Sequence, residues 1–377
     1  MFFKTVHKRS IINIGLIAAV TAAGGALLVW PQAVATGVSR GLSICGSVMI
    51  PSLFPFLVLA GFIVRSGMSG TLGRRLERPT RFLFVLPGCC GAAILVSMIG
   101  GYPAGGVAIR ELLEQKAITE AQARRMLRFC VNGGPAFVVS AVGAGLLGSV
   151  QKGLMLFAAQ ITASLLLGVA GRRKLEKELP QVKVKAKHVP AAAAFVESVN
   201  GACRSLLYIC GFVVLFAAAL SLGDASGFSG TFTHVAAVPL RWVGMGDAAP
   251  SVLPILSEVS CGSVEAAGAG IWAPFLLGAT LGWGGLSVHC QLAATLQGHR
   301  VMGRGFFAVR AFHALLGGGL SVILFRFAPM TTPAFIPNTP VVFQPFSTSA
   351  AASVALLLMC GAMILAEPSR DNAHRMG

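Results

Sequence analysis

The chain has 377 residues, of which 55% are hydrophobic and 11% are charged, and its mean hydropathy is +0.77. A soluble globular domain carries roughly 25% charged residues, so this composition excludes an ordinary soluble domain. Several apolar runs of about 20 residues instead indicate an all-α protein that crosses a lipid bilayer repeatedly.

The formal net charge of +17 does not indicate nucleic-acid binding. Lys and Arg lie mainly in short loops between apolar runs, as the positive-inside rule requires, and form no basic face interleaved with aromatic residues. The predicted partner of these loops is therefore the lipid bilayer, and no nucleic acid is expected. The nine cysteines lie mostly in apolar sequence without C-x-x-C spacing, so neither a metal site nor a cofactor is predicted.

The first two apolar runs are Ile11–Trp30 and Leu42–Val64. Basic residues precede the first run, as in a signal peptide, but the run is longer than a usual signal-peptide core. We therefore predict a retained first helix with its N-terminus in the cytoplasm. Pro51 and Pro55 remove two backbone donors from the second run, which should kink or interrupt that helix.

The next segment, Leu83–Ile109, is broken by the glycine-rich run Gly100–Gly106. If the basic loops on either side are both cytoplasmic, the segment is a re-entrant hairpin; if it crosses, every later segment is inverted. A broken backbone is tolerated in lipid only where protein or a water-filled cavity satisfies its polar groups. Arg110–Phe129 is too charged for lipid, and Thr119 with Gln122 matches a capping box, so an interfacial helix is predicted to begin there.

The remaining chain divides at a basic hydrophilic stretch, Arg172–Lys187. The segment Asp224–Ala249 leaves open whether it crosses, whereas Val252–Gln291 is punctuated by proline, glutamate and glycine and predicts a short helix and a hairpin. Further spans are predicted at Val131–Leu147, Leu154–Val169, Cys203–Leu222, Phe306–Phe327 and Ala350–Leu365.

A weaker echo of the first glycine break occurs at Gly282–His289. Corresponding interruptions in two halves point to an internal repeat with a midplane site, although glycines also gather where membrane helices pack closely. We therefore predict a helical membrane bundle of about 8–10 segments with two pseudo-repeated halves and re-entrant or broken helices. Its divisions are an N-terminal anchor helix (1–40), a first half (41–171), a basic cytoplasmic linker (172–195), a second half (196–327), a loop with a C-terminal helix (328–366) and a disordered tail (367–377).

Several motifs resemble one known family. They are Pro51–Phe56, Leu86–Cys89, Gly100–Gly105, Asn132–Pro135 and Gly284–His289. These runs are similar to the YlbJ-type sporulation integral membrane proteins, which are grouped with proteins that carry a nucleoside-recognition, or Gate, domain. The resemblance implies two Gate-like halves, a multi-pass location in the bacterial cytoplasmic membrane, a connection with spore cortex formation, and association with sporulation membrane proteins or with further copies of the chain.

Two functions follow as alternatives. One is a transporter-like protein that binds or moves a small polar solute between the two breaks, and the other is a non-transporting scaffold for assembly of the spore envelope. The predicted solute-binding residues supply polar backbone or hydrogen-bonding side chains at the breaks; they are Gly101, Tyr102, Pro103, Asn132, Glu258, Ser287, His289 and Gln291. For Tyr102 and Asn132, satisfying the broken backbone is an alternative role, and for His289 the alternative is a packed histidine bonded to a backbone carbonyl.

Glu258 and Glu265 are predicted as ion-coupling residues. They lie in apolar sequence two helical turns apart, so they could share one face and couple protons or bind a cation. The alternative is an extramembrane loop, where glutamate is ordinary. Arg310 and His313 are expected to anchor a helix at the interface. No enzyme is predicted, because the chain has no Walker A, H-E-x-x-H or G-x-S-x-G motif.

Overall fold

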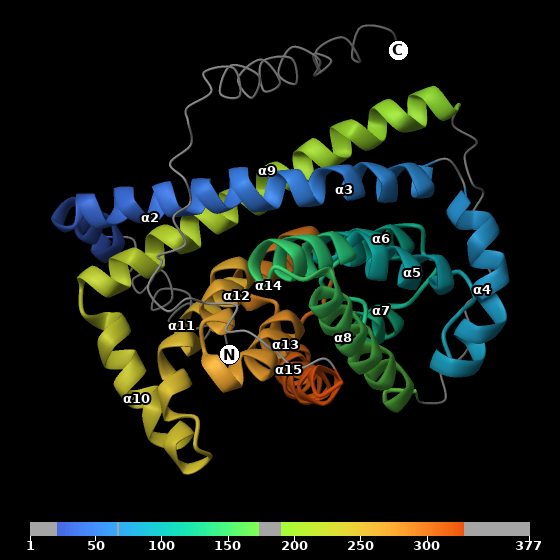
Figure 1. Ribbon diagram of the computed structural model, residues 1–377. Helices are drawn as coiled ribbons and strands as arrows, with labels where there is room; N and C mark the ends of the chain where they lie inside the picture. Colours follow the sequence, from blue (N-terminus) through green and yellow to red (C-terminus); the bar gives the residue numbers. More distant parts are fainter. Residues whose placement is uncertain (1–20, 66–67, 173–189, 328–377) are drawn as a thin grey trace, which may run out of the picture. The chain divides into compact units, whose positions relative to one another are not determined.

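The computed structural model describes residues 21–65, 68–172 and 190–327, and all regular secondary structure in these ranges is helical (Figure 1). The predicted all-α fold is therefore confirmed for the described part of the chain. The predictions for residues 1–20, for most of the basic linker and for everything after residue 327 lie outside it. Segments long and apolar enough to cross a membrane are Val150–Ala170, Ala191–Ala225, Gly270–Thr295 and Arg304–Phe325.

A long pair of helices lies along one side of the described bundle (Figure 1). Helix α2 (Pro31–Ile44) continues through a π-helical turn, η1 (Cys45–Met49), into α3 (Ile50–Arg65), so the expected boundary at residue 40 falls inside α2. The π turn ends two residues before Pro51, which cannot donate a backbone hydrogen bond. We call α2, η1 and α3 together with α9 (Ala191–Ala225) the rod pair.

Small residues bring the two members of the rod pair together. A Cβ atom on Gly37 would lie 2.6 Å from the Cα of Ala218, and one on Gly61 would lie 3.2 Å from the Cβ of Ser198. The start of α2 therefore meets the end of α9, and the end of α3 meets its beginning, so the helices run antiparallel. Close backbone approach of this kind is how membrane helices gain packing energy where lipid already solvates their apolar side chains.

The first half contains a helical hairpin where the sequence predicted one. Helix α5 (Cys90–Gly100) ends before Gly101, and α6 (Tyr102–Glu114) begins after it. A Cβ atom on Gly105 would lie only 3.0 Å from the Cβ of Ser97, which requires the two helices to fold back on each other. The hairpin therefore turns at Gly101, at the start of the predicted glycine run.

The capping box that was predicted at Thr119 is confirmed at the start of α7 (Glu120–Leu127). The Gln122 N–H donates to the Thr119 hydroxyl at 3.2 Å, and the Thr119 N–H donates to the Gln122 side chain at 2.8 Å. Residues 131–134 are non-helical and lead into a π-helix, η2 (Ala136–Leu146), which packs on α8 (Val150–Ala170). The predicted span at 131–147 is therefore interrupted at its start.

The second half also contains a hairpin and an interrupted helix. Helices α11 (Ala249–Ser257) and α12 (Val259–Ala267) fold back at Glu258, since a Cβ atom on Gly262 would lie 2.7 Å from the Cα of Ile255. The segment Asp224–Ala249, for which the sequence left open whether it crosses the membrane, includes helix α10 (Phe228–Trp242). The other elements are α4 (Met68–Phe84), η3 (Gly246–Ala248), η4 (Gly270–Trp272), α13 (Ala273–Trp283), α14 (Gly285–Thr295) and α15 (Arg304–Phe325).

The contact between α13 and α15 gives a first testable prediction. A Cβ atom on Gly278 would lie 2.5 Å from the Gly317 carbonyl oxygen, so Gly278→Ala must push the two helices apart. We expect a loss of about 1–3 kcal/mol of stability, measured as a lower thermal midpoint of the purified protein in detergent. Gly319→Ala on α15 is the control, because a Cβ atom there meets nothing within 4 Å. Equal midpoints for the two variants would contradict the close packing.

Candidate functional site

Backbone interruptions from both halves meet inside the helical bundle. Gly101 has φ 81° and ψ −169°, a conformation open essentially to glycine alone, and a Cβ atom there would lie 3.0 Å from the Gly134 nitrogen. A Cβ atom on Gly285 would lie 2.8 Å from the Cα of Glu258. Gly284, the neighbour of Gly285, approaches the first half, since a Cβ atom on it would lie 3.4 Å from the Tyr102 ring. The breaks predicted in the two halves are therefore neighbours.

A cavity of about 50 Å³ lies between these interruptions and the rod pair. This volume holds a few water molecules, because a single water needs roughly 10–15 Å³ measured in the same way. Most of its lining side chains are apolar. They come from the rod pair (Met49, Leu53, Phe56, Leu57 and Ile209) and from the interrupted segments (Ile99, Gly100, Gly101, Tyr102, Pro103, Gly134, Ala136, Phe137, Glu258, Val259, Val288 and Gln291).

The cavity separates the predicted site residues into two groups. Five of them line it: Gly101, Tyr102, Pro103, Glu258 and Gln291. The others, Asn132, Ser287, His289 and Glu265, lie outside its wall. Sequence reasoning missed the rod-pair residues completely, because their only signal is the two prolines near Leu53, and these mark a kink without indicating what packs against it.

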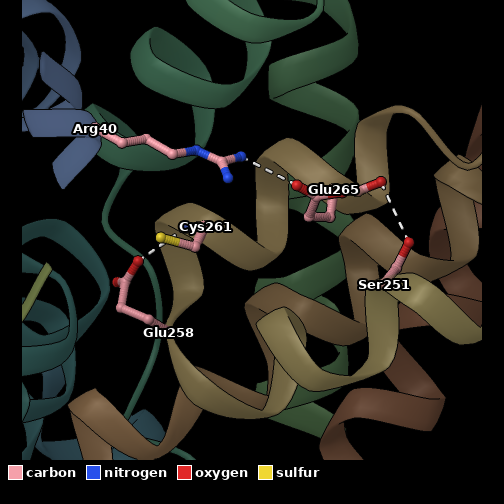
Figure 2. A network of polar contacts seen from close by, with 5 residues as sticks. All are labelled: Arg40, Ser251, Glu258, Cys261 and Glu265. Atoms are coloured by element: carbon pink, nitrogen blue, oxygen red, sulfur yellow. Dashed lines mark hydrogen bonds and ion pairs between the residues drawn. The ribbon is translucent and has the colours of Figure 1, made fainter. Parts of the chain in front are cut away.

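Among the described residues that line the cavity, Glu258 is the charged one. Its backbone is extended, with φ −150° and ψ 135°, and only 2% of the residue is exposed. One carboxylate oxygen accepts the N–H groups of Ser260 and Cys261 at 2.7 and 2.8 Å, so Glu258 caps the start of α12. The Cys261 thiol lies beside the same carboxylate (Figure 2). This capping role explains how the structure tolerates a carboxylate at the tip of a hairpin.

Glu265 has different surroundings from Glu258. It lies in the last turn of α12 and pairs with Arg40 of α2 at 3.1 Å, with both side chains about 40% exposed (Figure 2). An exposed pair of this kind contributes roughly 0–1 kcal/mol. Because Glu258 precedes the helix in an extended conformation, the helical spacing that suggested a shared face does not apply to these two carboxylates.

The broken end of α13 is satisfied by side chains from four other places in the chain. A helix end leaves its last carbonyls without intrahelical donors, and lipid supplies none. The donors here come from α6, α8, α15 and α14. Tyr102 and Gln160 donate to the Leu281 oxygen at 2.7 and 3.3 Å, Arg310 donates to the Gly282 oxygen, and His289 Nε2 lies 3.0 Å from the Trp283 oxygen. Tyr102 and His289 thus fill the alternative role that the sequence left open.

Arg310 and His313 are both completely buried, so the expectation of an interfacial anchor is wrong. The guanidinium donates to His313 Nδ1 at 2.9 Å; since guanidinium only donates, His313 carries its proton on Nε2, which donates to the Gln160 backbone oxygen at 3.3 Å. Among the described residues Arg310 has no carboxylate partner. The negative end of α13 offsets its charge instead. The sequence signal for this burial was the position of Arg310 within an apolar span, because a charged residue there normally faces the interior of the bundle.

Asn132, Ser287 and His289 are packed away from the cavity. The Asn132 amide donates to the Phe129 oxygen at 2.8 Å and to the Ser164 hydroxyl at 3.1 Å. The His289 ring makes edge contacts with the rings of Trp283, Phe306 and Phe307. The Asn132 oxygen, the Ser287 hydroxyl and His289 Nδ1 are buried and have no hydrogen-bond partner within the described part of the chain. None of the three residues lines the cavity.

No group of three or more His, Cys, Asp and Glu residues that could hold a metal ion occurs within the described residues. The chain is similar to the sporulation integral membrane protein YlbJ of Bacillus subtilis (strain 168), with 26% identity over 325 residues that cover 78% of each chain. No protein-family model matches the sequence. No solved structure matches it. The similarity and the apolar helices together support a location in the membrane.

Proposed function

We propose that this chain is a multi-pass protein of the bacterial cytoplasmic membrane that binds a small polar solute where its interrupted segments meet, and moves it across the bilayer. The observation that carries the proposal is the cavity beside Gly101, Gly134 and Glu258, which all come from breaks in apolar sequence. Interrupted helices are the usual place for substrate and ion sites in secondary transporters. The name of the B. subtilis relative supports an association with sporulation, and sporulation membrane proteins or further copies of the chain are proposed partners.

We infer that the two halves repeat in a different register from the one the sequence suggested. In chain order each half has a rod helix, a connecting helix, a hairpin, an interrupted helix and a final long helix. This order matches the hairpin tip Gly101 with Glu258 and the interruption at Gly134 with the one at Gly284. Two Gate-like halves related in this way would place both hairpin tips at one site, as inverted or parallel repeats do in transporters.

Roles within the site follow from chemistry. Glu258 and Gln291 would bind polar groups of the solute, while Gly101, Tyr102 and Pro103 shape the wall at the first hairpin tip. Asn132, Ser287 and His289 would hold the interruptions open around it. Glu258 and Glu265 are the proposed ion-coupling groups, and Glu265 would act through its pair with Arg40, which joins α12 to the rod pair.

A scaffold for spore cortex or envelope assembly is the second candidate. The small volume of the cavity and its mainly apolar wall favour it, because a scaffold needs no polar passage. A scaffold of this kind would use basic loops to hold its partners, and the largest such loop lies mostly outside the described residues.

Equilibrium binding to the purified full-length protein in lipid nanodiscs tests the proposal. The panel consists of nucleosides, amino acids and soluble cell-wall precursors, each at increasing concentration. We expect one class to bind saturably and Gln291→Leu to weaken that binding by about tenfold, which corresponds to about 1.4 kcal/mol for a lost polar contact. Glu114→Gln is the control, because Glu114 is an exposed partner of Arg110 on α6. Saturable binding by no member of the panel would favour the scaffold.

A further inference from the structure

Resting on that function, we propose that the cavity also binds a small monovalent cation, either an alkali-metal ion or a small ammonium. Its oxygen ligands would come from both halves of the chain. They are the Glu258 carboxylate, the main-chain carbonyls at the end of α5 and the side-chain amide of Gln291, and the residues that carry these groups line the cavity.

The charge of Glu258 is the first reason. The carboxylate is 2% exposed, and no Lys, Arg or His forms an ion pair with it among the described residues. The N–H groups of Ser260 and Cys261 and the start of α12 offset part of the cost of burial. A buried carboxylate without a cation remains expensive, so a positive ion beside it gains most of its attraction where water is scarce.

The supply of main-chain oxygen is the second reason. Helix α5 ends at Gly100, and both Ile99 and Gly100 belong to the cavity wall. The last carbonyls of a helix lack intrahelical donors and carry the negative end of its dipole. Carbonyl and carboxylate oxygens are the ligands that hard cations prefer, and unwound carbonyls at half-helix ends bind sodium ions or protons in transporters.

The size and lining of the cavity restrict the ligand. About 50 Å³ admits an ion with a water molecule or an ammonium with few heavy atoms in this conformation. Among the described residues no Lys, Arg or His lines the cavity, so its charged side chain, Glu258, favours a positive ligand in spite of the net charge of +17. The net positive charge of the chain therefore does not indicate the charge of a ligand in the cavity.

A cation in this place would join the two hairpins. Gly100 ends the first helix of one hairpin, and Glu258 is the tip of the other. Oxygen atoms from both would share one positive charge, so the hairpin tips should separate less readily when the ion is bound.

Tryptophan fluorescence provides the test. The Trp283 indole donates to the Leu256 oxygen at 3.1 Å, two residues before Glu258, so it should report changes at the hairpin tip. The full-length protein in nanodiscs is titrated with sodium, potassium or methylammonium chloride against N-methylglucamine chloride at constant ionic strength. N-methylglucamine phosphate serves as the anion arm, and Trp283→Phe identifies the responding indole.

We expect a saturable change with at least one of the three cations and none with phosphate. Glu258→Gln should weaken the response by about tenfold or more, since glutamine keeps an oxygen for capping α12 but loses the charge. Glu114→Gln should respond as the parent does. If Glu258→Gln fails to fold by gel filtration and circular dichroism, Gln291→Leu replaces it, with a smaller weakening expected.

Two results would overturn the inference. One is no change in fluorescence when sodium, potassium or methylammonium replaces N-methylglucamine; the other is an unchanged response in a folded Glu258→Gln protein. The outcome is separable from that of the proposed function. If a solute binds but none of the cations does, only the proposed cation site is contradicted. If a cation binds but no solute does, the cation site stands and the proposed solute transport is contradicted.

Discussion

Replacing Gly285 with alanine is expected to destabilise the protein strongly and to abolish binding at the cavity. Gly285 has φ 81°. An added Cβ atom would lie 2.8 Å from the Cα of Glu258 and 3.0 Å from the nitrogen of Val259. Left-handed backbone costs a non-glycine residue about 1–2 kcal/mol, and overpacking against rigid backbone adds about 1–3 kcal/mol. The sum is a large part of the stability of a typical domain.

Thermal unfolding in detergent, followed by fluorescence, measures the effect. Gly303→Ala is the matched control, because Gly303 has an ordinary extended φ of −149° and a Cβ atom there meets nothing within 4 Å. The control should keep the midpoint of the parent. A Gly285→Ala protein as stable as the control would mean that α14 does not approach the second hairpin tip as closely as described.

Loss of both donors to the Leu281 oxygen is expected to cost more than the sum of the single losses. Tyr102→Phe removes one donor and Gln160→Met removes the other, and each leaves the carbonyl with one partner. A single neutral hydrogen bond contributes about 0.5–1.5 kcal/mol. The double variant leaves the carbonyl buried without a donor at a helix end, which costs about 1–3 kcal/mol in addition.

A double-mutant cycle of thermal or denaturant unfolding measures this coupling directly. Tyr208→Phe is the control for the loss of a tyrosine hydroxyl, because Tyr208 on α9 is 70% exposed. That variant should be neutral alone and strictly additive with Gln160→Met. Additive effects of Tyr102→Phe and Gln160→Met would show that the end of α13 finds another donor. They would contradict the role of the Tyr102 hydroxyl in satisfying the Leu281 oxygen.

The sequence predicted the positions of the interruptions well because their causes are local. Clustered glycines weaken a helix locally, so the turn at Gly101 and the interruption at Gly284 could be placed from the sequence. The same is true of Thr119, whose capping partner lies three residues away. A single proline is weaker evidence, since Pro55 lies inside α3. The π-helical turn at Cys45–Met49 could not be predicted in the same way, since a nearby proline predicts a distortion of the helix but not its form.

The partners of each interruption could not be predicted, because they depend on contacts between distant parts of the chain. Tyr102 meets Leu281 at a separation of 179 residues, and His313 meets Gln160 at 153. No local pattern records such pairs. His289 illustrates the consequence: its position after a glycine break suggested a ligand, but its ring nitrogen faces the Trp283 carbonyl across the break.

The length of α9 has a consequence for the lipid around it. Its 35 residues span about 52 Å at 1.5 Å per residue, whereas the hydrocarbon layer is about 30 Å thick. The stretch between the exposed residues Arg204 and Asp224 covers about 30 Å, so it matches the acyl chains and leaves the first turns of α9 in the headgroup region. Bilayers with shorter or longer acyl chains should therefore tilt this helix, and with it the α2–α3 helix against which it packs.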